Sequence, residues 1–291
     1  GRRCPENNRV SAKGKRFIRK HKRIGMLSFD VAGAILLMAA FFIEAVVILL
    51  ERPGRDVVQD MKSNLLLGAL ILLTGMVMKG VELTVFSALY SVSLFKPSAT
   101  WELWIAGFLC CDFIHWFYHW LGHKTRLFWA AHVTHHSSEH FNLSTGWRTN
   151  FIHLFYRFLF WAPLCFIGFP PPMILFIESI TAMQNFLVHT EKVGKLAILD
   201  WLFNTPSNHR VHHGSNPEYI DKNLGGITML YDHLFGTYAK ERAPVVYGIT
   251  HNIHTHNPAA IIFHEFVRIG KAVPGIKGLK AKLQYLFSPP V

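Results

Sequence analysis

The stretch HWLGHKTRLFWAAHVTHH, from His119 to His136, places five histidines among bulky apolar residues. Histidine is costly to bury, and it adds little to an apolar core. The stretch also stands at the end of a strongly apolar run, residues 101–121. These histidines therefore need a role other than packing, and the segments around them decide the fold.

Long apolar runs on both sides of this stretch predict a membrane protein. The chain has 291 residues, of which 51% are hydrophobic and 16% charged. The apolar runs are 28–50, 63–78, 83–95, 101–121, 151–169 and 172–188. A membrane helix needs about 20 residues, so the short runs 63–78 and 83–95 form either a thin hairpin or one bent element. We expect an all-α integral membrane protein with four to six membrane helices in hairpins.

The charge of the chain is uneven, and its distribution predicts an orientation. Ten Lys and Arg residues lie between Arg2 and Arg23, just before the first apolar run. The positive-inside rule predicts that residues 1–27 form a cytoplasmic tail at anionic headgroups. We expect no nucleic-acid partner, because no basic and aromatic recognition module accompanies the tail.

Counting crossings from that tail predicts the side of the histidines. With two crossings in 63–95, every histidine-bearing helix end returns to the cytoplasmic face, whereas one bent crossing would break this parity. The predicted location is the endoplasmic reticulum or a bacterial inner membrane. Residues 28–100 would be N-terminal membrane helices and 101–262 the core, with two further membrane helices in a hairpin at 151–188. We expect 263–291 to be an amphipathic segment at the membrane surface.

Three histidine motifs lie at helical spacing. The first, HWFYHWLGH (115–123), repeats histidine at i, i+4 steps; the others are HVTHH (132–136) and HRVHH (209–213). On a helix, positions i, i+3 and i+4 are expected to converge on one face. Neutral imidazole is a good metal ligand, and eight or more such ligands are too many for one ion. The motifs therefore predict a dimetal site in a cytoplasmic, histidine-rich helical cap.

The identity of the metal follows less directly. Zinc cannot change its oxidation state, whereas iron can and so can activate dioxygen. The apolar helices next to the site favour oxidation of a lipid. We expect two iron ions, and the sequence leaves zinc open as an alternative.

The segments DFIHWFYHWLGH (112–123), HVTHHSSEHFNLSTGWR (132–148), TPSNHRVHHGSNPEYIDKNLGG (205–226) and VVYGIT (245–250) together resemble the fatty acid hydroxylase superfamily of membrane di-iron proteins, also called the sterol desaturase family. The resemblance covers roughly 108–251 and is strongest to the branch that oxidises alkylglycerols. It implies a non-haem di-iron monooxygenase that hydroxylates a C–H bond of a lipid with O2, the lipid being an alkyl ether lipid, a fatty acyl chain or a sterol. The metal ligands that it implies are His119, His123, His132, His135, His136, His189, His209, His212 and His213.

Five further residues either bind a metal or hold the outer nitrogen of a ligand: His115, Asp112, Asn185, Asn208 and Asp232. Some family members have a histidine at the place of Asn185, so one metal could have a ligand replaced by water here. We favour Asn208 and Asp232 as residues that hold a ligand, over Glu139, Asp221 and Asn223. We expect His140 to lie outside the site, and HNIHTH (251–256) to be a loop.

The electrons must come from outside the chain, because no nicotinamide or flavin motif of the GxGxxG type follows a predicted strand. The resemblance implies tetrahydrobiopterin, or a cytochrome b5-type or ferredoxin-type donor protein, as the reductant. A lipid desaturase on the same dimetal site is the main alternative. A histidine-rich metal transporter and a zinc hydrolase are further ones.

Overall fold

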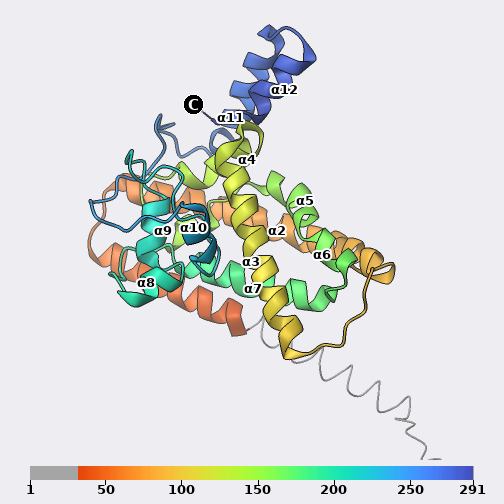
Figure 1. Ribbon diagram of the computed structural model, residues 1–291. Helices are drawn as coiled ribbons and strands as arrows, with labels where there is room; N and C mark the ends of the chain where they lie inside the picture. The colour runs from red at the N-terminus through yellow and green to blue at the C-terminus, as the bar shows by residue number, and fades with distance from the viewer. Residues whose placement is uncertain (1–31, 291) are drawn as a thin grey trace, which may run out of the picture.

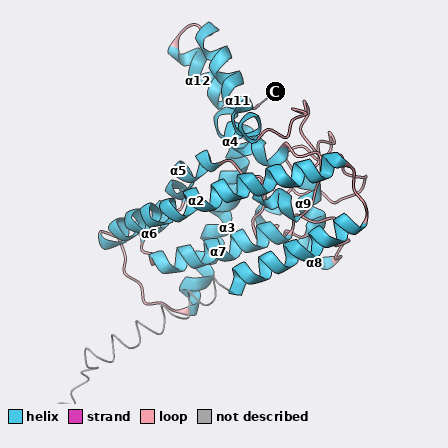
Figure 2. Ribbon diagram, turned by 180° about the vertical axis from the view of Figure 1, so that it is seen from behind, coloured by secondary structure: helices cyan, strands magenta, loops and turns pink. Residues whose placement is uncertain are grey.

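The computed structural model describes residues 32–290, and every regular element in that range is a helix (Figures 1 and 2). The predicted basic tail, residues 1–27, lies outside the described residues. The helices of four residues or more, after the N-terminal helix Ala32–Leu50, are α2 (Arg55–Ser91), α3 (Trp101–Lys124), α4 (Arg126–His136), η1 (Leu143–Trp147), α5 (Leu154–Arg157), α6 (Ala162–Ile167), α7 (Pro171–Leu187), α8 (Ile198–Leu202), α9 (Pro206–His212), α10 (Leu230–Phe235), α11 (Pro258–Ala272) and α12 (Leu279–Phe287). The three-residue 3₁₀ turns are η2 (Phe151–His153), η3 (Phe158–Phe160) and η4 (Val273–Gly275). The all-α prediction is confirmed for this range.

Two helices are long and apolar enough to cross a membrane, Ala32–Leu50 and α2. Phe41 and Ile48 of the first share a buried cluster with Met61 of the second. Much of their apolar surface packs against nothing: Leu72 and Val77, for example, are 65% and 70% exposed. Such a surface is typical of contact with lipid, and it indicates a membrane protein. The expected four to six spans are not confirmed, because only these two described helices meet the requirement.

Of the two alternatives for 63–95, the structure shows one element and not a hairpin, because α2 continues through KGVE (79–82) as one helix. Lys79 and Glu82 stand one turn apart and form an ion pair of 2.9 Å, so the two charges satisfy each other without ending the helix. At about 1.5 Å per residue, α2 is about 55 Å long, more than a bilayer core requires. Its first turns therefore extend beyond the apolar layer, toward the histidines.

One helix in place of two changes the number of crossings before the histidines from even to odd. The parity argument therefore no longer places the tail and the histidines on the same face. The structure does show which helix ends lie next to the histidine motifs. We call this part of the molecule the histidine end; it includes the start of α2, the end of α3 and the helix α4. Asp56, at the start of α2, bonds His140, and Lys124, at the end of α3, bonds Asp221.

Residues 151–187 form two arms joined by a turn, and the first arm is not one helix; that these arms are membrane helices stays a prediction. Residues 151–167 form short helical pieces, whereas the second arm, α7, is continuous. The turn between the arms lies at Gly168, whose φ of 138° brings its α-carbon close to Phe95; a Cβ there would lie 2.5 Å from the carbonyl oxygen of Phe95. The arms enclose the largest apolar cluster, which includes Trp161, Cys165 and Ile174.

The C-terminal part caps the histidine end. The amphipathic segment predicted from 263 is in fact two helices, because Pro274 and Gly275 interrupt it between α11 and α12. Ile261 of α11 is fully buried, and its carbonyl oxygen accepts a hydrogen bond from Thr134 of α4. The short helix α12 projects away from the body in both views (Figures 1 and 2). Its position at a membrane surface stays a prediction.

Candidate metal centre

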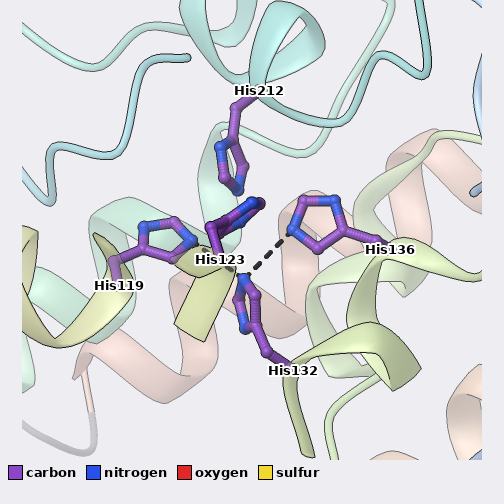
Figure 3. A group of neighbouring side chains, drawn as sticks. All are labelled: His119, His123, His132, His136 and His212. Atoms are coloured by element: carbon purple, nitrogen blue, oxygen red, sulfur yellow. Dashed lines mark hydrogen bonds between the residues drawn. The ribbon is translucent and has the colours of Figure 1, made fainter. Parts of the chain in front are cut away.

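Nine histidines form two adjacent groups inside the histidine end. The first histidine group is His119, His123, His132, His136 and His212, and the second histidine group is His135, His189, His209 and His213. In each group, one nitrogen from every member lies within 4.8 Å of the corresponding nitrogens of all the others. Figure 3 shows the rings of the first group turned toward a common centre. These are the nine residues that the sequence predicted as ligands.

The two HxxHH motifs each serve both groups, which differs from the single face expected for them. In α4, His132 and His136 join the first group while His135 joins the second. Successive helical residues turn by about 100°, so positions i and i+4 differ by about 40° and neighbouring histidines by about 100°. Adjacent histidines therefore point to different centres. Each motif therefore contributes rings to both groups. In the HRVHH motif, His212 joins the first group, while His209 and His213 join the second.

A four-residue segment, 221–224, holds three rings of the first group from outside. The Nδ1–H of His123 donates to the Asp221 carboxylate (3.2 Å). The Nδ1–H groups of His212 and His119 donate to the carbonyl oxygens of Lys222 (3.0 Å) and Leu224 (2.9 Å). A neutral imidazole has only one N–H, so each of these rings turns the lone pair of Nε2 inward.

The backbone of this segment explains how one short stretch supplies three acceptors. Asp221 and Asn223 have φ values of 59° and 54°, in the left-handed region that Asp and Asn tolerate better than most residues. The side chain of Asn223 then bonds the backbone of Asn208 and Ala239, which fixes the segment against α9. The Asp232 carboxylate accepts hydrogen bonds from Leu224 N (2.8 Å) and Gly225 N (2.7 Å).

The second group is held by carbonyl oxygens as well. The Nδ1–H of His135 donates to Arg148 O (3.2 Å), and that of His189 donates to Asn185 O (2.6 Å). Both rings therefore carry their lone pair on Nε2, and these two Nε2 atoms lie only 3.1 Å apart. Two lone pairs at this distance repel each other unless a cation lies near both.

The donor set fits metal ions in both groups. Burial lowers the pKa of His135 to about 4 and the pKa of His209 and His213 below the ordinary value, so these rings are neutral and can offer a lone pair. In the first group, Nε2 of His123 and Nε2 of His212 are buried and have no hydrogen-bond partner among the described residues. Buried polar atoms without a partner are rare, and a metal would satisfy them.

A buried ion pair anchors the loop that follows α4. Arg148 donates to Asp60 of α2 (3.1 Å), and both side chains are almost fully buried. The same guanidinium also donates to Asn64 Oδ1 and to Ser137, and the hydroxyl of Ser138 bonds Asp60. The carbonyl of Arg148 is the one that holds His135, so this network connects α2 to the second group.

The N-terminal helix reaches the site through Glu44. Its carboxylate accepts hydrogen bonds from Leu143 N (2.6 Å) and from the hydroxyl of Thr190, which directly follows His189. This buried charge in an apolar helix therefore faces the protein interior, as expected for an acid inside a membrane helix.

Aromatic rings cover the outer sides of both groups. Phe141 lies 5.2 Å from the ring of His213, centre to centre, and stacks on Tyr247 of the VVYGIT motif at 4.9 Å. On the first group, Trp129 lies 5.3 Å from the ring of His123. These rings limit the access of water to the centre.

Three of the five additional candidates lie close to the site without joining it. His115 belongs to neither group, and its Nε2 lies 3.4 Å from the side-chain nitrogen of Asn185. Asn185 supports His189 with its backbone carbonyl. Asp112 bonds Ile227 N and the hydroxyl of Thr228 and holds no histidine of the two groups.

The remaining two candidates, Asn208 and Asp232, bond backbone groups and not a ring of the two groups. The side chain of Asn208 donates to Asp200 O and Phe203 O, at the start of α9. Asp232 orients the backbone of Leu224 rather than a ring. The direct side-chain partner of a histidine is Asp221, so our preference for Asn208 and Asp232 over Asp221 is wrong. His140 lies outside both groups and bonds the exposed Asp56, and 251–256 is a loop, both as predicted.

Known proteins resemble the chain over the same segments. Residues 104–237 match the family model for fatty acid hydroxylase. The alkylglycerol monooxygenases of Xenopus tropicalis and Homo sapiens are each 34% identical to it, over 80% and 82% of this chain and 52% and 53% of theirs. The ornithine lipid hydroxylase OlsE of Rhizobium tropici is 29% identical over 48% of this chain and 43% of its own length.

The chain spans about half the length of these relatives. No solved structure matches it. The family model, the relatives and the two histidine groups agree with one another, and residues 104–237 of the chain match the fatty acid hydroxylase family.

Proposed function

We propose that the protein is a membrane-bound non-haem di-iron monooxygenase that hydroxylates a C–H bond of a lipid with O2. The observation that carries this proposal is the pair of adjacent histidine groups, in which His119, His123 and His212 of the first group and His135 and His189 of the second turn the lone pair of Nε2 inward. The relatives named monooxygenase and hydroxylase support the reaction type.

Each group would hold one metal ion, the first through five histidines and the second through four. When bound, a pair of iron ions supplies the redox chemistry that activates dioxygen. The chain's own residues orient the rings through their outer nitrogens, and the aromatic cover keeps water from the reacting atoms. With only four histidines, the second group leaves more room for a further ligand than the first.

A lipid is the substrate that suits this setting. The two candidate membrane helices present exposed apolar side chains, and both connect to the site, through Glu44 and through Asp60. The names of the relatives favour an alkylglycerol, and fatty acyl chains or sterols remain alternatives for the same centre. A lipid would enter from the bilayer, with its reactive carbon next to the histidine groups.

The electrons would come from a separate reductant, either tetrahydrobiopterin or a cytochrome b5-type or ferredoxin-type protein. This proposal rests on the absence of a nicotinamide or flavin motif in the sequence. We further propose that the histidine end is cytoplasmic, in the endoplasmic reticulum or a bacterial inner membrane, because Arg52, Arg55, Lys124 and Arg126 flank that end of the described helices.

The test is oxygen incorporation. The full chain is purified without oxygen, its iron is measured, and it is then given 18O2, tetrahydrobiopterin and a 1-O-alkylglycerol. We expect about two irons per chain and a product that carries one 18O atom. Failure to incorporate oxygen into this ether lipid, a fatty acyl lipid and a sterol, with either kind of reductant, would contradict the proposal.

The same experiment separates the alternatives. A desaturase would give a product lighter by two hydrogens, with no 18O. A zinc hydrolase would act on its substrate in the absence of oxygen. A metal transporter would release its metal readily to a chelator, whereas the buried rings described above predict slow release.

A further inference from the structure

The short helices α8 and α10 present large apolar side chains to the outside. Ile198 and Trp201 of α8 are 65% and 49% exposed, and Leu234 of α10 is 67% exposed. Further exposed apolar residues on or next to these helices are Leu199, Leu202, Phe203, Leu230 and Phe235. An apolar surface of this extent is unusual in water, and it is typical of a surface that contacts a membrane or another protein.

The polar side chains of the same two helices are bonded inside the protein. The Asp200 carboxylate accepts a hydrogen bond from the hydroxyl of Thr205 (2.5 Å). Asp232 is fully buried, and the Nε2–H of His233 donates to Trp201 O (2.9 Å). The outward face of α8 and α10 is therefore mainly apolar.

This face continues an exposed apolar row on α3. The row has i, i+4 spacing and follows most of that helix; its residues are Trp101, Ile105, Leu109, Phe113 and Phe117. The hydroxyl of Tyr231, on α10, donates to Leu109 O (2.8 Å), and the rings of Phe113 and Phe235 lie 6.3 Å apart, centre to centre. Such a row on a long helix is typical of contact with lipid, so α8 and α10 extend a surface that already suits a bilayer.

Basic side chains lie beside this apolar face. A recess of about 760 Å³ is lined by two of the apolar side chains and by three exposed basic ones, namely Ile198, Trp201, Lys195, Lys240 and Arg242. The acidic side chains of the recess are engaged inside the protein: Asp200 as described above, and Glu241 in an ion pair of 2.8 Å with Arg210. Positive charge next to exposed apolar groups is typical of proteins that lie on an anionic membrane surface.

We propose that α8 and α10 lie in the surface of the lipid bilayer. Their exposed apolar side chains reach the acyl chains, and Lys195, Lys240 and Arg242 contact the phosphates of anionic headgroups. Continuity with the row on α3 favours lipid over a protein partner, because one bilayer covers both surfaces at once. This inference goes beyond the proposed function and does not depend on the reaction.

The contact sets the height of the metal centre relative to the membrane. α8 is bonded directly to α9, which lies next to it in Figure 1: the side chain of Asn208 donates to Asp200 O (2.5 Å) and to Phe203 O (2.9 Å). The HRVHH motif (209–213) follows Asn208 and supplies rings to both histidine groups. The metal centre therefore lies close to the headgroup layer, where a lipid approaches it without leaving its own leaflet.

The first test measures what surrounds α10. The full chain, with its four natural cysteines replaced by alanine, is loaded with zinc to prevent turnover and placed in vesicles of phosphatidylcholine and phosphatidylserine. A nitroxide spin label is attached at Leu234→Cys or, as a control, at Glu218→Cys, which is exposed outside the apolar face. Its relaxation by O2, which concentrates in the bilayer, is compared with its relaxation by a water-soluble nickel chelate.

We expect O2 to be the stronger relaxing agent at Leu234→Cys and the nickel chelate to be the stronger one at Glu218→Cys. Stronger relaxation by the nickel chelate at both positions would place α10 in water and overturn the proposal. Protection of Leu234→Cys from both agents would overturn it as well, because a second copy of the chain or another protein would then cover the surface.

The second test measures the headgroup contact. A fluorophore at Ile198→Cys is quenched by phosphatidylserine or by phosphatidylcholine that carries a nitroxide near the top of an acyl chain, at equal fractions of the bilayer. We expect phosphatidylserine to be enriched about 5-fold or more near this position. Replacing Lys195, Lys240 and Arg242 together by glutamine should make the two lipids quench equally.

A matched control removes the same charge elsewhere. Lys271, Lys277 and Lys280 are exposed at the end of α11 and on or near α12, which projects away from the body (Figure 1). Their joint replacement by glutamine should leave the enrichment at Ile198→Cys unchanged. Equal quenching by the two lipids in the unchanged protein, or the same loss of enrichment in both triple variants, would overturn the assignment of the three basic residues to headgroups.

Discussion

Asp221 combines two properties that usually belong to different residues. Its left-handed backbone, with φ of 59°, helps to direct the next carbonyl toward His212, and its carboxylate accepts the Nδ1–H of His123. Lys124 pairs with the other carboxylate oxygen. The charge and the backbone conformation can be separated by substitution, because asparagine tolerates positive φ while lacking the charge.

We expect Asp221→Asn to keep the fold and to weaken metal binding in the first group about 10-fold to 100-fold, the usual effect of losing a carboxylate behind a ligating histidine. The measurement is the metal retained per chain during dialysis against a series of chelator concentrations. Asp221→Ala should lose metal and also unfold at a lower temperature, because alanine is strained at that φ. Equal metal retention in Asp221→Asn and the unchanged protein would show that the carboxylate does not support His123.

The two histidines His135 and His140 lie in neighbouring parts of the same segment and allow a matched comparison. His135→Ala removes one of only four rings from the second group, so turnover should be abolished while the protein still inserts into the membrane. His140→Ala removes a ring that bonds only the exposed Asp56, and its activity should stay within about twofold of the unchanged protein. Activity in both variants would refute the assigned ligands, and an inactive His140→Ala would extend the site beyond the two groups.

Eight of the nine histidines could be predicted because imidazole is distinctive and its spacing follows the helix, whereas His189 was predicted only from the resemblance to the family. Their outer partners were harder to predict, because most of them act through a backbone carbonyl, which every residue has. Asp221 does act through its side chain, but it lies in a loop and its partner His123 is 98 residues earlier in the chain. No local spacing connects two residues so far apart, so only the folded chain reveals the pair. The backbone partners are Lys222, Leu224, Arg148 and Asn185.

At the scale of elements, α2 shows that a short charged stretch inside an apolar run can belong to one continuous helix when its charges form an ion pair. The sequence KGVE has two charges and a glycine within four residues, a pattern that is typical of a turn. The ion pair between Lys79 and Glu82 makes these residues compatible with a helix, and Glu82 is buried rather than exposed in a loop. Such compensation depends on neighbours that the local sequence does not contain. The sequence therefore predicted the apolar runs but left open whether they form a hairpin or one element, and the structure shows one continuous helix.

The ion pair between α2 and the loop after α4 gives the prediction for this scale. Asp60→Ala would leave the guanidinium of Arg148 buried with Asn64 and Ser137 but without an anion, and we expect a loss of about 3–5 kcal/mol in the free energy of unfolding. Chemical unfolding of the detergent-solubilised protein measures it. Asp56→Ala, one turn earlier on the same helix, is the control, because Asp56 is 69% exposed and its loss should cost about 1 kcal/mol or less. Similar losses in the two variants would show that burial of the pair has no special importance.

At the scale of the whole molecule, the helices carry the chain between a histidine end and an opposite end. The histidine end includes the connection 51–54 and the junction between α3 and α4, and the opposite end includes the connection 92–100 and the turn at Gly168. Most of the Lys and Arg residues in these short connections, or next to them, belong to the histidine end. They are Arg52, Arg55, Lys124 and Arg126, against Lys96 at the opposite end.

Within the described residues this distribution favours a cytoplasmic histidine end, whereas the ten Lys and Arg of residues 2–23, taken with an odd number of crossings, favour the opposite orientation. A labelling experiment separates the two orientations. Single cysteines are placed at Glu218, exposed at the histidine end, and at Ser98, exposed at the opposite end, in a chain whose four natural cysteines are replaced by alanine. A membrane-impermeant maleimide added to sealed vesicles with the cytoplasmic face outward should label Glu218→Cys and should leave Ser98→Cys unlabelled until detergent is added. The reverse pattern would place the metal centre on the other face, out of reach of a cytoplasmic reductant. Labelling of both cysteines in intact vesicles would show that α3 and α2 do not separate the two ends by a bilayer.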